Sequence, residues 1–456
     1  MSSLSRVLSA LAVALTAVLS TTAAGAAAVP DDERSVRELA TAQDLSFGVM
    51  SPADALADPG YADLVAANAT TISTSNELSF AVVQPEQGTF DFGPAEALVD
   101  FAVEHGLTVR GHDLIAPGEL PVWVTDGAWD AASLTEVIID HVTTVVSHFA
   151  ERNPGVITDW DVVRRAGLAA GAQRPSVLQA VLGDAWVDAA FDAARAADPA
   201  AQLFYDDFFD DVAMAHEAAR SGQPIVQGAD AAHTTCDAVP RCGGVASLVG
   251  GLVAREVPID GVGFEAHLFS AEPVDFTQFS RWVSDLELEW AITEFDVPLP
   301  ATEVATAEML TFQADTYRAA LAACVDAADC DTFVSWGLSD RYSPVPDETG
   351  GVYGGALWFA DDGTPKPAHD AIRDVLAANA PPAPPTTAPP TTDPPVSPEA
   401  SSSLADDDVA ASSEDDSGSV LVPAAIGAAA LVAVAALVVA LVRLRRRRTP
   451  ASPPIS

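Results

Sequence analysis

An alternation of short apolar runs with amphipathic stretches, between residues 45 and 378, constrains the fold more than any other feature. The runs have the length of buried strands, and the stretches between them place apolar residues at helical i, i+3, i+4 and i+7 spacing. Eight strand–helix units of this kind predict an α/β fold, the (β/α)8 TIM barrel. The predicted strands are Leu45–Met50, Ala69–Ser73, Thr108–His112, Thr158–Val163, Gln202–Asp206, Gly261–His267, Glu289–Glu294 and Thr332–Trp336.

Both ends of the chain carry apolar segments that do not belong to this pattern. Residues 1–28 begin with one basic residue, continue with an apolar run and end in small residues, which is typical of a signal peptide. Residues 420–442 form an uncharged apolar run, long enough to cross a bilayer as a helix. The arginine-rich tail at 443–456 follows directly, and basic clusters stay on the cytoplasmic side. We therefore expect an exported single-pass membrane protein with the barrel outside and a basic cytoplasmic tail.

A linker at 379–418 separates the barrel from the predicted transmembrane helix. It is rich in Pro and Thr first and in Asp and Ser afterwards. Proline-rich sequence favours extended polyproline II geometry, and acidic sequence without aromatic residues favours disorder. We expect a disordered stalk that holds the barrel away from the lipid bilayer.

The charge of the chain argues against one class of partner. There are 65 acidic and 22 basic side chains, with a formal net charge of −43. An open surface of this sign repels phosphates, so we expect no nucleic-acid partner. Neither a glycine-rich phosphate loop nor an HExxH motif occurs, and the Asp-rich stretch at 206–211 lacks the EF-hand pattern. We therefore expect no cofactor and no metal.

Four cysteines form two close pairs, Cys236 with Cys242 and Cys324 with Cys330. An even number of cysteines in an exported chain favours disulfides. Metal binding is the alternative, but neither pair has CxxC spacing and no histidine lies within a pair.

Polar residues at the ends of the predicted strands are the candidate site, because barrel enzymes keep their chemistry at the carboxyl ends of strands. Glu294 ends one strand, and Glu265 with His267 ends the preceding one. Neighbouring strands lie about 4.8 Å apart, so these side chains can meet. A carboxylate held by an imidazole suits nucleophilic or electrostatic work on a sugar. The alternative is that Glu294 is an ordinary acid at the barrel mouth of a very acidic protein. The other candidates are Asn76, His112, Arg164, Arg165, Asp206, Asp207 and Trp336.

A series of motifs, in this order along the chain, resembles the family 10 glycoside hydrolases. This family comprises the retaining endo-β-1,4-xylanases, which are built on a (β/α)8 barrel. The resemblance implies a β-linked polysaccharide such as xylan as the partner of the barrel, and a disulfide between Cys324 and Cys330. The matching stretches are SNELSF, QPEQGTFDF, VRGHDLI with LPVWV, DWDVV, AWVDAAFDAARAADPAAQLFYDDF, PIDGVGFEAHL, ITEFDV, CVDAADCDTFVSWGLSDRYS and ALWFADDGTPKPAHDAI.

Carried over motif by motif, the resemblance assigns roles to five residues. Glu294 of ITEFDV is the nucleophile, and His267 of FEAHL orients it. Trp336 of SWGLSD is an aromatic platform for the substrate. Asn76 and His112 contact sugar hydroxyls near the cleavage point.

The acid/base position departs from the family pattern. WDVV is followed by Arg164 and Arg165 where the family has Asn-Glu, so Arg165 stands at the position of the acid/base glutamate. Arginine cannot serve as the general acid or base of the reaction, because its pKa exceeds about 12 and it stays protonated. A nearby Arg165 also favours the ionised form of Glu294. Two substrate-binding positions differ as well, since Glu265 replaces a glutamine and Asp206 an asparagine. Further departures are Ser75, Ser79, Ala116 and Pro117.

Three functions remain open at this point. The domain can be a binder of β-1,4-linked polysaccharide with impaired hydrolysis. It can be an active β-glycosidase whose acid/base has moved to Glu265, Asp206 or Asp207. It can also be a non-catalytic binder of an anionic glycan, because paired arginines hold carboxylates or phosphates bidentately. A fourth interpretation of Arg164 and Arg165 is that they neutralise an acidic cavity and bind no ligand.

Overall fold

Eight parallel strands close into a barrel in the order β1-β2-β3-β4-β5-β6-β7-β9. The computed structural model describes residues 33–167, 174–208, 236, 240–268, 276–301 and 304–382. The prediction of a (β/α)8 barrel is confirmed. The strands are β1 (Ser46–Met50), β2 (Thr71–Ser73), β3 (Thr108–Gly111), β4 (Ile157–Arg164), β5 (Gln202–Phe208), β6 (Gly261–His267), β7 (Glu289–Asp296) and β9 (Cys330–Ser335).

The strand ends differ from the predicted ones at positions that matter for the site. β5 continues to Phe208, because its last residues pair with β6 up to Phe208 opposite Glu265. β7 continues to Asp296, which pairs with His267 of β6. Several of the residues predicted to follow strands therefore belong to the strands themselves.

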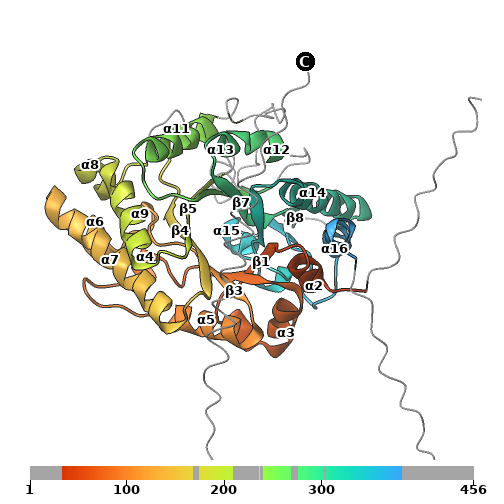
Figure 1. The fold of residues 1–456 in the computed structure, drawn as a ribbon. Helices are drawn as coiled ribbons and strands as arrows, with labels where there is room; N and C mark the ends of the chain where they lie inside the picture. Colours follow the sequence, from red (N-terminus) through yellow and green to blue (C-terminus); the bar gives the residue numbers. More distant parts are fainter. Residues whose placement is uncertain are drawn as a thin grey trace, which may run out of the picture. The chain divides into compact units, whose positions relative to one another are not determined.

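Helices surround the barrel, as Figure 1 shows for α7, α9, α11, α14 and α16. α7 is the longest of the described helices, and Asp130 caps its first turn by accepting a hydrogen bond from the Ser133 backbone N–H. Its apolar stripe includes Leu134, Ile138 and Val142 and is buried against the barrel wall. The longer helices are α3 (Pro59–Asn68), α5 (Gly93–His105), α7 (Ala131–Arg152), α9 (Ala185–Ala197), α11 (Pro240–Ala254), α14 (Ala307–Asp326) and α16 (Pro367–Asn379).

Short helices lie mostly in the connections between strands and outer helices. They are α2 (Val36–Thr41), α4 (Phe80–Val83), α6 (Val122–Thr125), α8 (Val177–Leu182), α12 (Phe276–Phe279), α13 (Arg281–Asp285) and α15 (Val345–Glu348), with 3-10 turns at Ala55–Ala57 and Asp340–Tyr342.

The connection from β9 to α16 is tied back to the carboxyl end of β7. Its strand β10 (Tyr353–Gly354) pairs antiparallel with β8 (Leu299–Pro300), which follows β7 by only a few residues. Lys366 Nζ donates to Asp340 Oδ2 at 3.0 Å and to the Gly355 carbonyl at 2.8 Å. This connection carries α15, so α15 is held at the edge of the barrel where the site lies.

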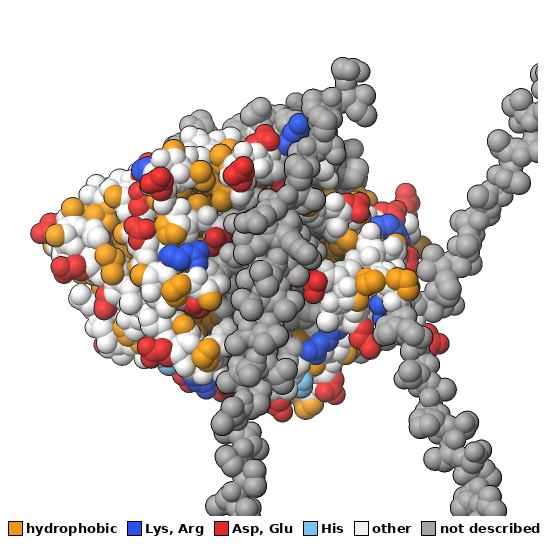
Figure 2. Space-filling view, in the orientation of Figure 1, with side chains coloured by type: hydrophobic (Ala, Val, Ile, Leu, Met, Phe, Trp, Pro, Cys, Tyr) orange, Lys and Arg blue, Asp and Glu red, His pale blue; other side chains and the backbone are white. Residues whose placement is uncertain are grey.

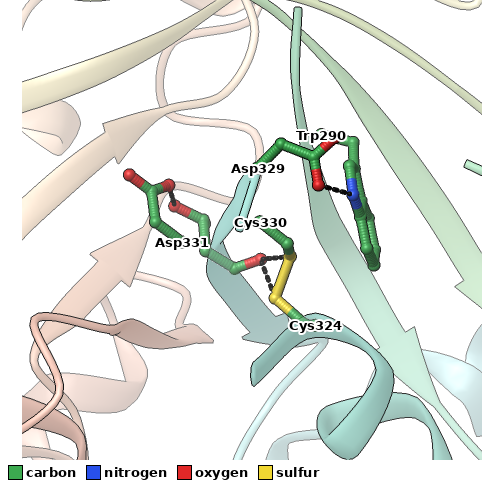
Figure 3. The surroundings of a disulfide bond; sticks show 6 residues. Trp290, Cys324, Asp329, Cys330 and Asp331 are labelled. Atoms are coloured by element: carbon green, nitrogen blue, oxygen red, sulfur yellow. Dashed lines mark hydrogen bonds between the residues drawn. A yellow bond between two sulfur atoms is a disulfide. The ribbon is translucent and has the colours of Figure 1, made fainter. Parts of the chain in front are cut away.

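Both predicted disulfides are present, Cys236–Cys242 and Cys324–Cys330. The second joins the last turn of α14 to the first residue of β9, next to the Asp329 carboxylate that accepts from the Trp290 indole N–H (Figure 3). Because the sulfurs are bonded to each other, the alternative of a cysteine metal site is wrong. This bridge lies at the amino end of β9, away from the strand ends that carry the candidate site.

Acidic side chains are scattered over the visible face of the protein with fewer basic ones among them (Figure 2). No helix among the described residues is both long and apolar enough to cross a bilayer. The predicted signal peptide at 1–28, the linker from 383 to 418, the transmembrane helix at 420–442 and the tail at 443–456 lie outside the described residues.

Candidate active site

Glu294 lies near the end of β7 with its carboxylate held between two histidines. His267 Nε2 is 2.8 Å from Oε2, and His112 Nε2 is 3.2 Å from Oε1. Burial acts to raise the pKa of Glu294, but the hydrogen bonds from His112 and His267 and the charge of Arg165 outweigh it. The pKa of Glu294 therefore lies well below its ordinary value. At neutral pH this buried carboxylate is ionised.

Each of these histidines is itself held between two carboxylates. His267 Nδ1 lies 2.9 Å from Asp296 Oδ2, and His112 Nδ1 lies 2.8 Å from Asp161 Oδ2. Burial acts to lower the pKa of both imidazoles, but their carboxylate partners raise the pKa of both well above the ordinary value. Asp161 also accepts from Arg110, which fixes its position. Protonated imidazoles donate from both ring nitrogens, so they hold Glu294 in one orientation.

The register of two neighbouring strands brings the predicted groups together. β6 pairs with β7 so that Glu265 lies opposite Glu294, after a register shift between Phe264 and Glu265. Trp336 follows β9, and its ring centroid lies 5.3 Å from that of His112 and 6.2 Å from that of His267. The predicted proximity of Glu294, Glu265 and His267 is confirmed.

Arg165 lies beside the carboxylate of Glu294. Its Nε is 2.8 and 2.6 Å from the two oxygens of Glu265, and its Nη2 also contacts Glu265. Nη2 is 3.6 Å from Glu294 Oε2, and the guanidinium lies over the Phe208 ring, 4.0 Å from its centroid. The side chain of Arg165 is 23% exposed, whereas Glu265 is fully buried.

The backbone at Arg165 adopts a conformation that is unfavourable for a residue with a side chain. Its φ is +54°, in the left-handed region, where a non-glycine residue is uncommon. Its N–H donates to the Asp206 carbonyl at 2.8 Å, so the last residues of β4 and β5 support this turn. Strain of this kind is concentrated at functional sites. The turn directs the Arg165 side chain toward Glu265 and Glu294.

Arg164 is buried and pairs mainly with two other carboxylates, Asp113 and Glu119. It contacts Asp113 through Nε and Glu119 through Nη2 at 2.6 Å, and its Nη1 is 3.9 Å from Glu265. Its charge is therefore matched by internal acids. This geometry agrees with neutralisation of an acidic cavity at Arg164 and leaves little of its guanidinium for an anionic ligand.

Two of the acids considered as replacements for the missing glutamate are held inside the barrel. Both oxygens of Glu265 accept hydrogen bonds from Arg165. Burial raises the pKa of Glu265, although the Arg165 charge opposes the shift.

Asp206 is fully buried, with Oδ1 accepting a hydrogen bond from Thr293 Oγ1 at 2.6 Å. Burial and the charges of Asp161 and Glu265 raise the pKa of Asp206 well above its ordinary value. A Cβ at Gly263 would lie 2.1 Å from Asp206 Oδ1, so the missing side chain there makes room for it.

Asp207 faces away from these groups, because side chains alternate along β5. Its Oδ2 accepts from the Tyr205 hydroxyl at 2.6 Å and from the Gly167 N–H at 3.3 Å. Its Oδ1 accepts from the Phe208 N–H at 2.8 Å. The structure therefore does not bring Asp207 to Glu294.

Asn76 does not join the group of interacting residues. It lies in the connection after β2 and is exposed, and its side-chain amide donates to Ser75 Oγ at 3.4 Å. Its backbone N–H donates to Glu77. Among the described residues, no contact links Asn76 with Glu294, His112 or Trp336.

Sequence reasoning did not single out two acids that act on the site. Asp161 of β4 binds His112 and Arg110. Its signal in the sequence is a charged residue between the apolar residues of a strand predicted to be buried, because buried charges need partners. Glu348 lies at the end of α15, where no strand rule applies. Burial raises the pKa of Glu348; the charge of His267 opposes this, and those of Asp296 and Glu294 add to it. Glu348 is partly buried, in the connection that the pairing of β10 with β8 holds at this edge of the barrel.

Two clusters have the residue types of a metal site, His112/Asp161/Asp206 and Glu265/His267/Glu294. Both histidines are held between carboxylates that favour the protonated form, which has no lone pair for a metal. Arg165 also lies on the oxygens of Glu265. These donor sets suit internal ion pairs better than a divalent cation.

Comparison with known proteins decides the family. The model of glycosyl hydrolase family 10 matches residues 35–239 and 210–375. The chain belongs to glycosyl hydrolase family 10. Endo-1,4-beta-xylanase B of Thermotoga neapolitana is 31% identical over 290 residues, 63% of this chain and 75% of the relative. Endo-1,4-beta-xylanase C of Phanerodontia chrysosporium is 30% identical over 333 residues, 72% of this chain and 75% of the relative.

Solved family 10 structures agree with the barrel. Xylanase 10B from Thermotoga maritima superposes with a TM-score of 0.64 at 30% identity, covering 75% of this chain and 98% of that one. Xylanase 10B from Thermotoga petrophila RKU-1, in complex with xylobiose, gives 0.65 at 29% identity, covering 76% and 98%. The predicted family is confirmed, and the roles of individual residues remain predictions.

Proposed function

We propose that this family 10 domain binds a β-1,4-linked polysaccharide such as xylan and keeps only the nucleophilic half of the retaining reaction. Relatives are endo-1,4-β-xylanases and two structural neighbours hold xylobiose, which supports xylan as the glycan. The observation that carries the proposal is Arg165, which is paired with Glu265 and lies 3.6 Å from Glu294. Hydrolysis of an unactivated glycan is impaired because of it.

The nucleophilic half depends on Glu294. A retaining glycosidase uses one carboxylate to attack the anomeric carbon and form a covalent glycosyl-enzyme. Glu294 is ionised and oriented by His267 and His112, as that step requires. Trp336 lies against both histidines and is the aromatic platform of this half.

The other catalytic role in a retaining glycosidase is to donate a proton to the departing oxygen. In retaining enzymes a second carboxyl group lies about 5–5.5 Å from the first and protonates that oxygen. Arg165 lies beside Glu294 but keeps its proton at every physiological pH. General acid help is worth about 10²–10⁴-fold in rate, so an alcohol leaving group departs slowly from this site.

Recognition of an anionic glycan by both arginines has less support. Arg164 is buried and engaged by Asp113 and Glu119. One edge of Arg165 is engaged by Glu265. The two guanidinium groups therefore do not both have free pairs of N–H donors for the carboxylate of a uronic acid.

A second candidate function is an active β-glycosidase with a relocated acid, and the specific observation in its favour is Glu348. Glu265 is paired with Arg165, Asp206 is buried beneath the site, and Asp207 faces away. Glu348 is partly exposed and lies in α15, in the connection that the pairing of β10 with β8 holds at this edge of the barrel, so its carboxyl group is the candidate general acid.

We further propose that the barrel is exported and held at the cell surface. The signal pattern at 1–28 and the apolar run at 420–442, followed by arginines, support this arrangement. Alkaline extraction of membranes tests it, because a chain anchored by 420–442 stays in the pellet and a variant truncated after 382 is released.

One experiment separates the two functions. The substrate is 2,4-dinitrophenyl β-xylobioside, whose leaving group needs little acid help. Impaired hydrolysis predicts a burst of dinitrophenolate, a stalled glycosyl-enzyme visible by mass spectrometry, and xylan left intact. Glu294→Gln removes the burst. Xylan cleavage at ordinary xylanase rates that Glu348→Gln abolishes would instead establish the relocated acid.

A further inference from the structure

Within the described part of the chain, one edge of the Arg165 guanidinium is occupied by hydrogen-bond partners. Arginine has five N–H donors in a planar fork. The pairing with Glu265 uses Nε and Nη2, which form the side-on edge. Among the described residues, Nη1 has no hydrogen-bond partner, and Nη2 has Glu294 Oε2 at 3.6 Å in addition to Glu265. These donors form the end-on edge of the fork.

This end-on edge lies next to the nucleophile. Nη2 is 3.6 Å from Glu294 Oε2, and 23% of the Arg165 side chain is exposed, whereas Glu265 and Glu294 are buried. The partly exposed Arg165 side chain is therefore the cationic group that a substrate meets beside Glu294. Glu265 and the Phe208 ring hold the guanidinium plane in place, so little side-chain freedom is lost when a ligand binds.

A fixed cation cannot give up a proton, but it can stabilise an oxygen that leaves as an anion. Guanidinium forks bind carboxylates and phosphates through two parallel hydrogen bonds. A leaving group that is already the conjugate base of an oxoacid needs no general acid. The same edge would hold an incoming oxoanion, which needs no general base.

We propose that this site transfers glycosyl groups between Glu294 and the oxygen of an oxoacid, either a phosphate or a carboxylate, rather than to and from alcohols. In the first step Glu294 attacks the anomeric carbon, the bond to the oxoacid oxygen breaks, and the electron pair leaves with the oxoanion. In the second step inorganic phosphate attacks the same carbon, frees the Glu294 carboxylate and gives a β-glycosyl phosphate. Charge balances in both steps and no proton moves.

This inference rests on the proposed function, because it needs Glu294 as the nucleophile. The test uses full-length protein with 2,4-dinitrophenyl β-xylobioside as donor and inorganic phosphate as the acceptor probe. Dinitrophenolate release is followed past the burst, and the product is identified by mass spectrometry. We expect phosphate to raise the steady-state rate in a saturable way, on the order of tenfold or more, with xylobiosyl phosphate as product.

Three variants make the test specific to Arg165. Arg165→Met keeps the length of the side chain without its charge and loses saturation by phosphate. Arg165→Lys keeps the charge without the fork and requires more phosphate for half-saturation. Arg318→Met removes an exposed arginine of α14 and leaves the response unchanged. Circular dichroism confirms that each variant is folded.

The outcomes distinguish the two proposals. A wild-type burst with no effect of phosphate and no xylobiosyl phosphate overturns this inference and leaves the proposed function standing. An equal response in Arg165→Met also overturns the inference. Absence of the burst itself overturns both proposals.

Discussion

The two halves of the site differ in how much of a working glycosidase they keep. On the β6–β7 side, Glu294 is ionised and held by His267 and His112, each with its own carboxylate partner. On the β4 side lies Arg165, which we propose stands at the acid/base position and which is paired with Glu265. Both halves form well-connected networks within one barrel. Under the proposed function, a fold can keep a site polar and well connected while one of its two catalytic roles is lost.

The largest expected effect comes from restoring the β4 side. Arg165→Glu alone places a third carboxyl group beside Glu265 and Glu294, and their mutual repulsion limits recovery. The double variant Arg165→Glu/Glu265→Gln removes this repulsion. We expect it to cleave xylan about 10²–10⁴-fold faster than the wild type.

Reducing-sugar release from xylan measures this prediction. Arg318→Glu/Glu265→Gln is the matched control, since it makes the same change of charge with the glutamate outside the site. If the double variant at Arg165 is no faster than the wild type, then the β4 side is not what limits the reaction.

A smaller effect is expected from removing a disulfide that lies in the barrel scaffold, outside the active site. The Cys324–Cys330 bridge closes a short loop, with a sequence separation of 6, at the amino end of β9. The variant Cys324→Ala/Cys330→Ala loses about 2 kcal/mol of unfolding free energy, because the unfolded chain regains loop entropy. Denaturant titration measures this loss. The burst with the dinitrophenyl substrate is unchanged, and a lost burst in a folded variant would show that scaffold and site are not separable.

The smallest effect is the pH dependence of stability from His267. Its folded pKa is raised well above the ordinary value near 6.5, so its stabilising contribution is complete below that pH and is lost as the pH rises. Above about pH 6.5 the unfolding free energy falls by about 1.4 kcal/mol per pH unit for this group. Denaturant titrations from pH 6 to 7.5, a range over which this loss stays below the ~2 kcal/mol expected for the disulfide, compare the wild type with His267→Gln. The variant lacks this slope, and equal slopes would mean that His267 is neutral in the folded protein.

The sequence predicts the barrel because local patterns decide it. Apolar runs and helical spacing set the eight strands, and motifs such as ITEFDV and FEAHL predict which strand ends carry Glu294 and His267. The presence of Arg165 at the position proposed for the proton donor is likewise visible in WDVVRR. These features depend on residue type and order alone.

Features that depend on register and packing could not be predicted in the same way. The pairing of Arg165 with Glu265 requires the left-handed φ at Arg165 and the register shift before Glu265. Glu348 lies in a connection that reaches the site through the pairing of β10 with β8. Asn76 follows a strand as expected but is exposed, because the connection after β2 turns its side chain toward solvent.

The most direct test of a missing proton donor is the dependence of the first step on the leaving group. Burst rates are measured for a series of aryl β-xylobiosides whose phenols become steadily less acidic. Without a general acid, the rate falls steeply along the series and vanishes for an alkyl xylobioside. A nearly flat series, in which wild-type protein releases weakly and strongly acidic phenols at similar rates, would contradict the account.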